Sequence, residues 1–128
     1  MITYTSLSPR ALEAVVEGRV TKEDVREAFA RMEALMAASD KVDMLADVRA
    51  GMQIDLAAIG EEMRHLSLIG RMLGKMDRVA LVADQAWIRA IATIESYLLP
   101  SIDYRVFERS EAAEARAFIL CQDETSPA

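Results

Sequence analysis

The sequence RVALVAD at residues 78–84 holds five consecutive apolar residues, Val79 to Ala83, between Arg78 and Asp84. An unbroken apolar run of this length is typical of a strand in the middle of a parallel sheet, buried on both faces. The segments on both sides of the run are therefore expected to supply helices that cover it.

Two helical patterns precede the run. Thr21 stands before Lys22, Glu23 and Asp24, an arrangement that predicts a capping box and the start of a helix. That helix carries one apolar stripe, formed by Val25, Ala28, Phe29, Met32, Leu35 and Met36. A second helix is predicted over about 56–76, with apolar residues every three or four positions.

Two more helices are predicted after the run. Asp84 is placed to cap a third helix, which must end before Pro100. Its apolar side is expected to consist of Trp87, Ile91, Ile94 and Leu98. Ser110 is placed to cap a final helix whose inward residues are Ala115, Phe118 and Ile119.

The remaining segments predict strands. Residues 42–48 and 103–107 each suit a strand, and residues 12–20 alternate apolar and charged side chains. A short strand with Ile2 and Tyr4 is joined to the latter by the turn at residues 8–10, which favours an antiparallel hairpin. The predicted fold class is α/β: one mixed sheet of about five strands with this hairpin at its edge, the other strands mostly parallel, and four helices packed on the sheet. Residues 1–121 are expected to form a single domain, with a flexible C-terminal tail at 122–128.

Composition narrows the functional class. The chain has 52% hydrophobic and 28% charged residues, which is typical of a globular protein. With 15 basic and 21 acidic residues its net charge is −6, which argues against nucleic-acid binding. The longest stretch without a charged residue covers positions 1–9, too short for a membrane span. The N-terminus lacks the pattern of a secretory signal, so a cytoplasmic location is expected, with peripheral membrane contact left open.

No catalytic or metal-binding constellation stands out. His65 and Cys121 are the single histidine and cysteine, too few for a zinc site of the usual composition. No nucleophile-elbow pattern accompanies His65, which is expected to be an exposed helical residue. We therefore expect a protein that is not an enzyme and needs no metal or cofactor. A strongly shifted carboxylate pKa in a cleft near Asp47, Asp55 or Asp84 would favour an enzyme instead.

Four short motifs occur in a characteristic order: EGRVTKED at 17–24, RVALVADQAW at 78–87, RVF at 105–107 and EAR at 114–116. Over roughly residues 10–121 the chain resembles SpoIIAA-like proteins of the STAS and CRAL-TRIO-like α/β class. The resemblance implies a binding module that holds lipids or other apolar ligands, with a helix that opens and an association with membranes. Phe118 departs from the tryptophan usual in relatives. The loop at residues 47–55 contains no serine or threonine, which argues against the phosphorylation switch of the sporulation regulators.

Five residues are the expected ligand contacts. Met52, Ile54 and Leu56 place apolar side chains in a loop, where burial in the main core does not explain them. Met63 belongs to a methionine-rich stretch between Met32 and Met76, which suits variable apolar partners or, alternatively, fills the core. Trp87 follows the carboxyl end of the central strand, where ligands bind in open α/β sheets. A tryptophan in this position more commonly anchors its helix in the core.

The second helix has two further features. Gly60, Gly70 and Gly74 weaken it, as a moving lid requires, although Gly70 and Gly74 can instead allow close packing on a neighbouring element or in a homodimer. Basic residues on its flank can contact an anionic membrane surface or form an ordinary solvated face. These residues are Arg64, Arg71, Lys75 and Arg78.

The leading hypothesis is a non-enzymatic binding module for an apolar or lipid-like ligand, held under a mobile second helix and associated with membrane surfaces. The alternative is a STAS-type regulator that binds a protein partner through the same surface without a phosphorylatable serine. The two hypotheses imply different partners: a co-purified small molecule in the first case and a regulatory protein in the second.

Overall fold

The computed structural model describes residues 1–63 and 66–120, without the side chains at positions 62, 63, 66 and 68. Three strands precede the first helix, two strands and two helices follow it, and the chain ends as strand, helix, strand, 3₁₀ turn and helix. Their bounds are β1 Ile2–Ser8, β2 Ala11–Val16, β3 Arg19–Val20, α1 Lys22–Ala38, β4 Val42–Val48, β5 Gln53–Ile54, α2 Leu56–Met63, α3 Leu66–Lys75, β6 Met76–Ala83, α4 Ala86–Leu98, β7 Asp103–Phe107, the 3₁₀ turn η1 Arg109–Glu111 and α5 Ala112–Leu120.

The main sheet has five strands in the order β1-β2-β4-β6-β7. β1 and β2 form an antiparallel hairpin at one edge, and all the other pairs are parallel. The apolar run quoted above lies in β6, between β4 and β7, and Val79 to Ala83 are all buried. The α/β class, the mixed sheet and the position of the hairpin are therefore confirmed.

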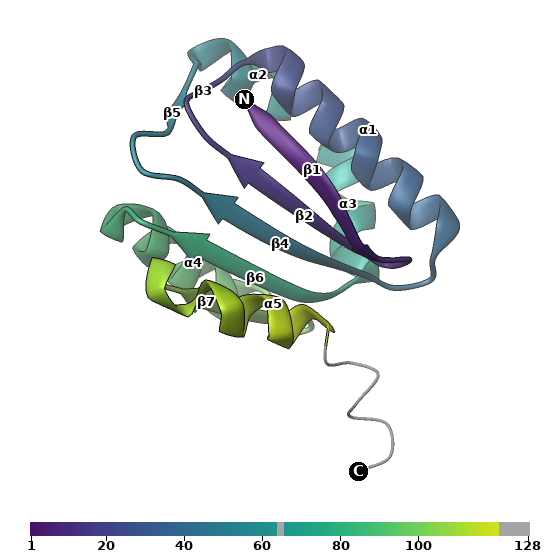
Figure 1. Ribbon diagram of the computed structural model, residues 1–128. Helices are drawn as coiled ribbons and strands as arrows, with labels where there is room; N and C mark the ends of the chain where they lie inside the picture. The colour runs from purple at the N-terminus through teal and green to yellow at the C-terminus, as the bar shows by residue number, and fades with distance from the viewer. Residues whose placement is uncertain (64–65, 121–128) are drawn as a thin grey trace.

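Helices cover both faces of the sheet. In Figure 1 α5 lies in front of the strands, and α3 and α4 lie behind them. The core under α5 is built from alternate residues of the central strands, including Leu45, Ala80 and Val82, packed on Phe118 and Ile119. The opposite face packs against α1, α3 and α4.

The methionines mostly fill that second core. Met32, Met36 and Met76 are buried in it, and Met44 and Met72 pack against the same cluster. For these residues the core-filling interpretation of the methionine-rich stretch is correct. The side chain of Met63 lies outside the described residues.

The helix caps match the prediction at only one helix. Thr21 accepts a hydrogen bond from the Asp24 backbone N–H, and the Asp24 carboxylate accepts one from the Thr21 backbone N–H, so the capping box of α1 is confirmed. The prediction for Asp84 is wrong: α4 begins after Gln85, because the Asp84 carboxylate is bound to Arg109. Ser110 lies inside η1, and Glu108 and Glu111 form the capping box there.

The second helical segment differs from the prediction in two ways. The described residues form two helices, α2 and α3, instead of one, so five α-helices replace the expected four in the described part of the chain. Met76, the last residue of the predicted helix, belongs to β6, because it pairs with Val42 of β4 in the parallel ladder.

The apolar side of α4 is also different from the prediction. Ile88 and Ala92 pack into the core, together with strand residues of β6 and β7. The side that carries Trp87, Ile91, Ile94 and Leu98 is exposed instead. The spacing of these four residues is correct for one face of a helix, but that face points away from the sheet.

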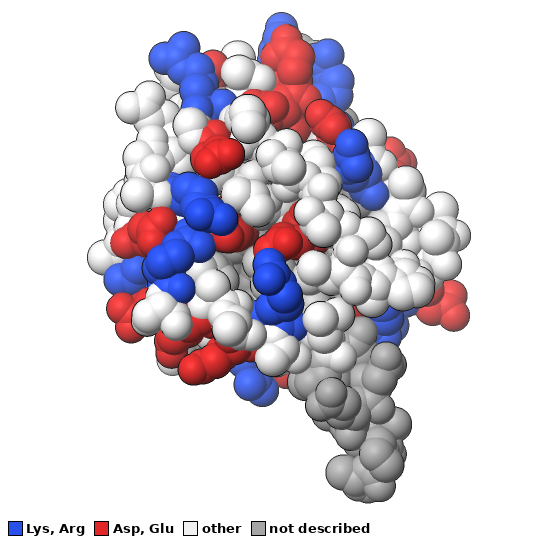
Figure 2. All heavy atoms as spheres, in the orientation of Figure 1, with Lys and Arg blue, Asp and Glu red and all other residues white. Residues whose placement is uncertain are grey.

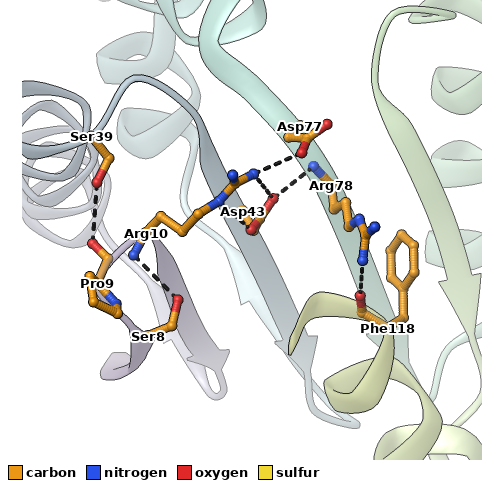
Figure 3. A network of polar contacts seen from close by, with 8 residues as sticks. All are labelled: Ser8, Pro9, Arg10, Ser39, Asp43, Asp77, Arg78 and Phe118. Carbon is orange, nitrogen blue, oxygen red and sulfur yellow. Dashed lines mark hydrogen bonds and ion pairs between the residues drawn. The ribbon is translucent and has the colours of Figure 1, made fainter. Parts of the chain in front are cut away.

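An ion network joins three neighbouring strands, β2, β4 and β6, at their amino ends. Asp43 of β4 accepts hydrogen bonds from the Arg10 guanidinium at 2.9 and 3.1 Å and from the Arg78 backbone N–H at 3.0 Å. Arg10 also donates to Asp77 of β6 at 2.7 Å (Figure 3). The Arg10 side chain therefore reaches from the turn before β2 across β4 to β6.

Charged side chains are mixed over the surface. On the face drawn in Figure 2, basic and acidic side chains lie next to one another between uncharged areas.

Candidate functional site

A short second sheet fixes the loop that follows β4. Gly51 adopts a φ of +79°, a conformation that other residues rarely adopt. After this turn β5 pairs in parallel with β3, Arg19 with Gln53 and Val20 with Ile54. Since β3 lies between β2 and α1, the loop is tied back to the body of the fold. It thereby holds Met52 and Ile54 beside α4.

Three of the five expected ligand residues line one cavity of about 320 Å³, which we name the α4 pocket. Met52 and Ile54 come from the loop and β5, and Trp87 comes from the first turn of α4. Trp87 is 55% exposed and Ile54 is 49% exposed, so both side chains stand at the surface. The other lining residues are Leu81, Ile88, Ile91, Ala92, Glu95 and Tyr104.

The lining is apolar apart from one polar corner. The Tyr104 hydroxyl donates a hydrogen bond to Glu95 Oε1 at 3.1 Å. Burial raises the pKa of Tyr104 above its ordinary value, and the charge of Glu95 raises it further. The phenol therefore stays protonated at neutral pH and keeps the Glu95 carboxylate oriented. A ligand in this pocket meets hydrocarbon on most sides and a carboxylate at one.

A larger groove of about 580 Å³ lies between α1 and the β1–β2 hairpin. Small side chains form much of it, among them Ala30, Ala34 and Ala38. The α4 pocket is the stronger candidate because its loop follows the carboxyl end of β4, and ligands of open α/β sheets bind beyond strand carboxyl ends.

The remaining two expected ligand residues are Leu56 and Met63. Leu56 is 86% exposed at the start of α2 and does not line the cavity. The side chain of Met63 lies outside the described residues. His65 also lies outside them.

The three basic residues that the structure describes do not form one patch. Arg71 lies 3.5 Å from Glu33 of α1. Lys75 donates hydrogen bonds to the carbonyl oxygens of Met36 and Ser39, at the C-terminal end of α1. Arg78 lies on the opposite face of the sheet, where it donates to the Phe118 carbonyl oxygen at 2.9 Å (Figure 3). Arg64 lies outside the described residues.

Arg109 links the ends of β4 and β6 behind the pocket loop. Its guanidinium donates two hydrogen bonds to the Asp84 carboxylate, at 2.9 and 3.1 Å, and forms an ion pair with Asp47 at 2.6 Å. The hydrogen bonds from Arg109 hold the pKa of Asp84 below its usual range. A carboxylate with a lowered pKa stays ionised, which suits a structural ion pair and not a general acid.

The three glycines of the second helical segment have free space around them. A Cβ added at Gly60, Gly70 or Gly74 meets nothing within 4 Å. Close packing of Gly70 and Gly74 on another element of the same chain is therefore wrong for the described residues. These glycines therefore act by lowering the helix propensity of α2 and α3.

We expect that replacing Gly60, Gly70 and Gly74 together by alanine stabilises the protein. Each change removes backbone freedom from the unfolded chain and adds about 0.4 to 1 kcal/mol, since each site is helical and open. Urea unfolding followed by circular dichroism measures the gain. Gly51→Ala is the matched control and should destabilise, because its φ is +79°. A loss of stability in the triple variant would contradict the geometry.

Sequence reasoning missed most of the pocket floor. Tyr104 and Leu81 belong to strands that were predicted, but their common face depends on the parallel register, in which Val79 pairs with Tyr104 and Leu81 with Val106. Glu95 could not be identified as a pocket residue from the sequence, because one acidic residue on a helix is usually solvated. The alternation in residues 103–107 was the available clue: it puts Tyr104 and Val106 on one face.

Two absences concern the described part of the chain alone. No group of three histidine, cysteine, aspartate or glutamate side chains there is arranged to hold a metal ion. None of its helices has the length and apolar character needed to cross a membrane.

Comparisons with known proteins identify the family. A sequence model described as SpoIIAA-like matches residues 11–120. A crystal structure of an uncharacterised DUF3478-family protein with a SpoIIAA-like fold, from Shewanella loihica PV-4, superposes with a TM-score of 0.62 at 16% identity, covering 93% of this chain and 92% of that one. No curated protein matches the sequence. The family match extends over nearly the whole described fold, and the chain belongs to the SpoIIAA-like family.

Proposed function

We propose that this protein is a binding module that takes an apolar or lipid-like ligand in the α4 pocket. The family and fold support a non-enzymatic, regulatory type of module. The observation that carries the finer proposal is the convergence of Met52, Ile54 and Trp87 on one apolar cavity. A flexible thioether and an indole ring adapt well to ligands of varied shape.

The size of the pocket limits the ligand. Its volume of about 320 Å³ is near the lower end of the roughly 300–1,000 Å³ found for ligand sites. It accommodates a small apolar molecule or one end of a longer chain whose remainder leaves between Ile54 and Trp87. An amphiphile with a hydroxyl or amine near its apolar part could also bond to Glu95.

Opening of α2 and contact with membranes complete this proposal. The exposed Leu56 and the open Gly60 support an α2 that moves. Opening has to break contacts, however, because Ala58 is buried and Glu61 is bound to Arg26 of α1. Membrane contact has weaker support than the sequence suggested, because Lys75 and Arg78 have partners within the fold. Arg71 keeps 65% of its side chain exposed, although Glu33 lies 3.5 Å away.

The alternative function is a protein-interaction regulator of the STAS type. The exposed apolar face of α4 favours it, because large exposed apolar patches mark interaction sites. The pocket loop contains no serine or threonine, so regulation by phosphorylation of that loop is not part of this alternative.

The test uses native mass spectrometry of freshly purified protein, followed by titration with lauric acid. Trp87 is the single tryptophan, so its fluorescence reports directly on the pocket. Ile54→Glu places a carboxylate at the pocket mouth and should weaken laurate binding at least tenfold. Gln53→Glu adds the same charge at the neighbouring exposed position outside the lining, and should bind laurate like wild type.

The outcomes separate the candidates. A lipid-sized mass lost on denaturation, or saturable laurate binding that Ile54→Glu weakens and Gln53→Glu does not, supports the ligand proposal. A bare polypeptide mass together with no laurate response would overturn it and favour the regulator. Binding to anionic phosphatidylserine vesicles that is unchanged by Arg71→Glu would remove the proposed membrane contact through α3.

A further inference from the structure

The outer side of α4 carries a continuous apolar stripe. Its members are 50 to 72% exposed, and Tyr97 beside them is 82% exposed. A helix that is apolar both toward the core and toward solvent is usually buried on both sides. We name the four residues Trp87, Ile91, Ile94 and Leu98 the α4 stripe.

The stripe has no charged residue. α4 contains two charged residues, and both turn elsewhere. Arg89 donates to the carbonyl oxygens of Ala83 and Asp84, and Glu95 accepts from Tyr104. A chain of net charge −6 without a cation on this stripe is poorly suited to an anionic membrane, whereas an uncharged surface can meet its own copy without repulsion.

The spacing of the stripe is symmetric under reversal. Its residues are separated by four, three and four positions, the seam spacing of packed helices. Two copies of α4 in antiparallel orientation about a two-fold axis place Trp87 against Leu98 of the other copy. They also place Ile91 against Ile94. Each contact then occurs twice, as an isologous interface requires.

The exposed area is sufficient for such an interface. At the exposed fractions given, the stripe and Tyr97 offer on the order of 700 Å² per copy, and a standard interface buries about 800 Å² per partner. Ile54 lines the α4 pocket together with Trp87 and Ile91 and is 49% exposed, so its side chain adds to this area.

We propose that the α4 stripe is the interface of a homodimer in which two α4 helices pack antiparallel about a two-fold axis. This interface is different from the Gly70 and Gly74 face that the sequence suggested for a homodimer. Trp87 and Ile91 also line the α4 pocket, so the dimer would cover part of the pocket mouth, whereas Ile94 and Leu98 do not line it and test the dimer separately from ligand binding.

Sedimentation velocity over a range of concentrations tests the dimer. Wild-type protein should sediment as a dimer at about 50 µM, and both Ile94→Glu and Leu98→Glu should shift the apparent dissociation constant at least tenfold toward monomer. Thr93→Glu is the matched control on the same helix, roughly a third of a turn from the stripe, and should remain dimeric. Since all three positions are exposed, circular dichroism should show each variant folded.

Register is tested by cross-linking in a Cys121→Ser background. Ile91→Cys protein mixed with Ile94→Cys protein should form a mixed disulfide under oxidised glutathione, because antiparallel packing puts position 91 against 94. Either variant alone should cross-link poorly. A monomeric wild type at 500 µM, a dimer unaffected by Ile94→Glu, or preferential cross-linking of Ile91→Cys to itself would overturn the proposal.

Discussion

Replacing Arg10 by methionine should destabilise the protein by about 3 to 5 kcal/mol, the largest loss we expect from a single side chain outside the apolar core. Asp43 has 0% of its side chain exposed, and Arg10 supplies two of its hydrogen bonds. Methionine keeps the length of the arginine stem but removes the charge. The variant leaves a carboxylate in the middle of the sheet with the Arg78 backbone N–H as its remaining donor in the described network.

Urea denaturation at neutral pH measures this loss. Arg71→Met is the matched control, because its partner Glu33 is half exposed and surface pairs contribute about 0 to 1 kcal/mol. Arg10→Met combined with Asp43→Asn should recover part of the stability, since the amide is uncharged and its oxygen can still accept from Arg78. A single variant within 1 kcal/mol of wild type would show that the network contributes little.

The order of the strands and helices was predictable because it depends on local patterns. The apolar run at Val79 to Ala83 can be satisfied only in a strand covered on both faces. The alternation in residues 12–20 indicates a half-buried strand, but the structure ends β2 at Val16, starts β3 at Arg19 and buries Glu13 beside Arg116. Such patterns indicate whether a segment forms a strand or a helix without information on the residues that it contacts. The capping box at Thr21 and Asp24 is local in the same sense, and it was predicted correctly.

What the sequence did not predict depends on partners far along the chain. Met76 continues a helical pattern, but the ladder to Val42 makes it a strand residue. Asp84 is a good helix cap by position, yet Arg109, 25 residues later, offers it two charge-assisted hydrogen bonds. In both cases a long-range contact outweighs a local preference.

The candidate site was also only partly predictable from the sequence. Met52, Ile54 and Trp87 were identifiable because apolar residues in a loop, or after a central strand, have no obvious place in the core. Their meeting in one pocket depends on the β3–β5 pairing, two residues long on each side and too short to give a pattern. The exposed face of α4 could not be predicted, since periodicity defines a face but not its direction.

Arg109→Met should lower stability by about 2 to 3 kcal/mol at neutral pH. Asp47 is almost fully buried, with 8% of its side chain exposed, and loses its closest cation. The effect should be smaller than that of Arg10→Met because Arg49 still approaches Asp47 at 3.3 Å. Arg71→Met is again the control, since Arg71 pairs with a half-exposed Glu33.

The difference between wild type and Arg109→Met should also depend on pH. Arg109 lowers the pKa of Asp84 in the folded protein below the unfolded value of about 3.9. A lowered folded pKa stabilises the protein above the unfolded pKa, and this contribution disappears as the pH falls through the folded pKa. The stability gap between the two proteins should therefore be largest above pH about 5 and shrink toward pH 2.

Both proteins should still lose stability in acid, because hydrogen bonds from Thr21 lower the pKa of Asp24 in each of them. A gap that stayed constant from pH 7 to pH 2 would mean that Arg109 acts through packing of its stem and not through the carboxylate of Asp84.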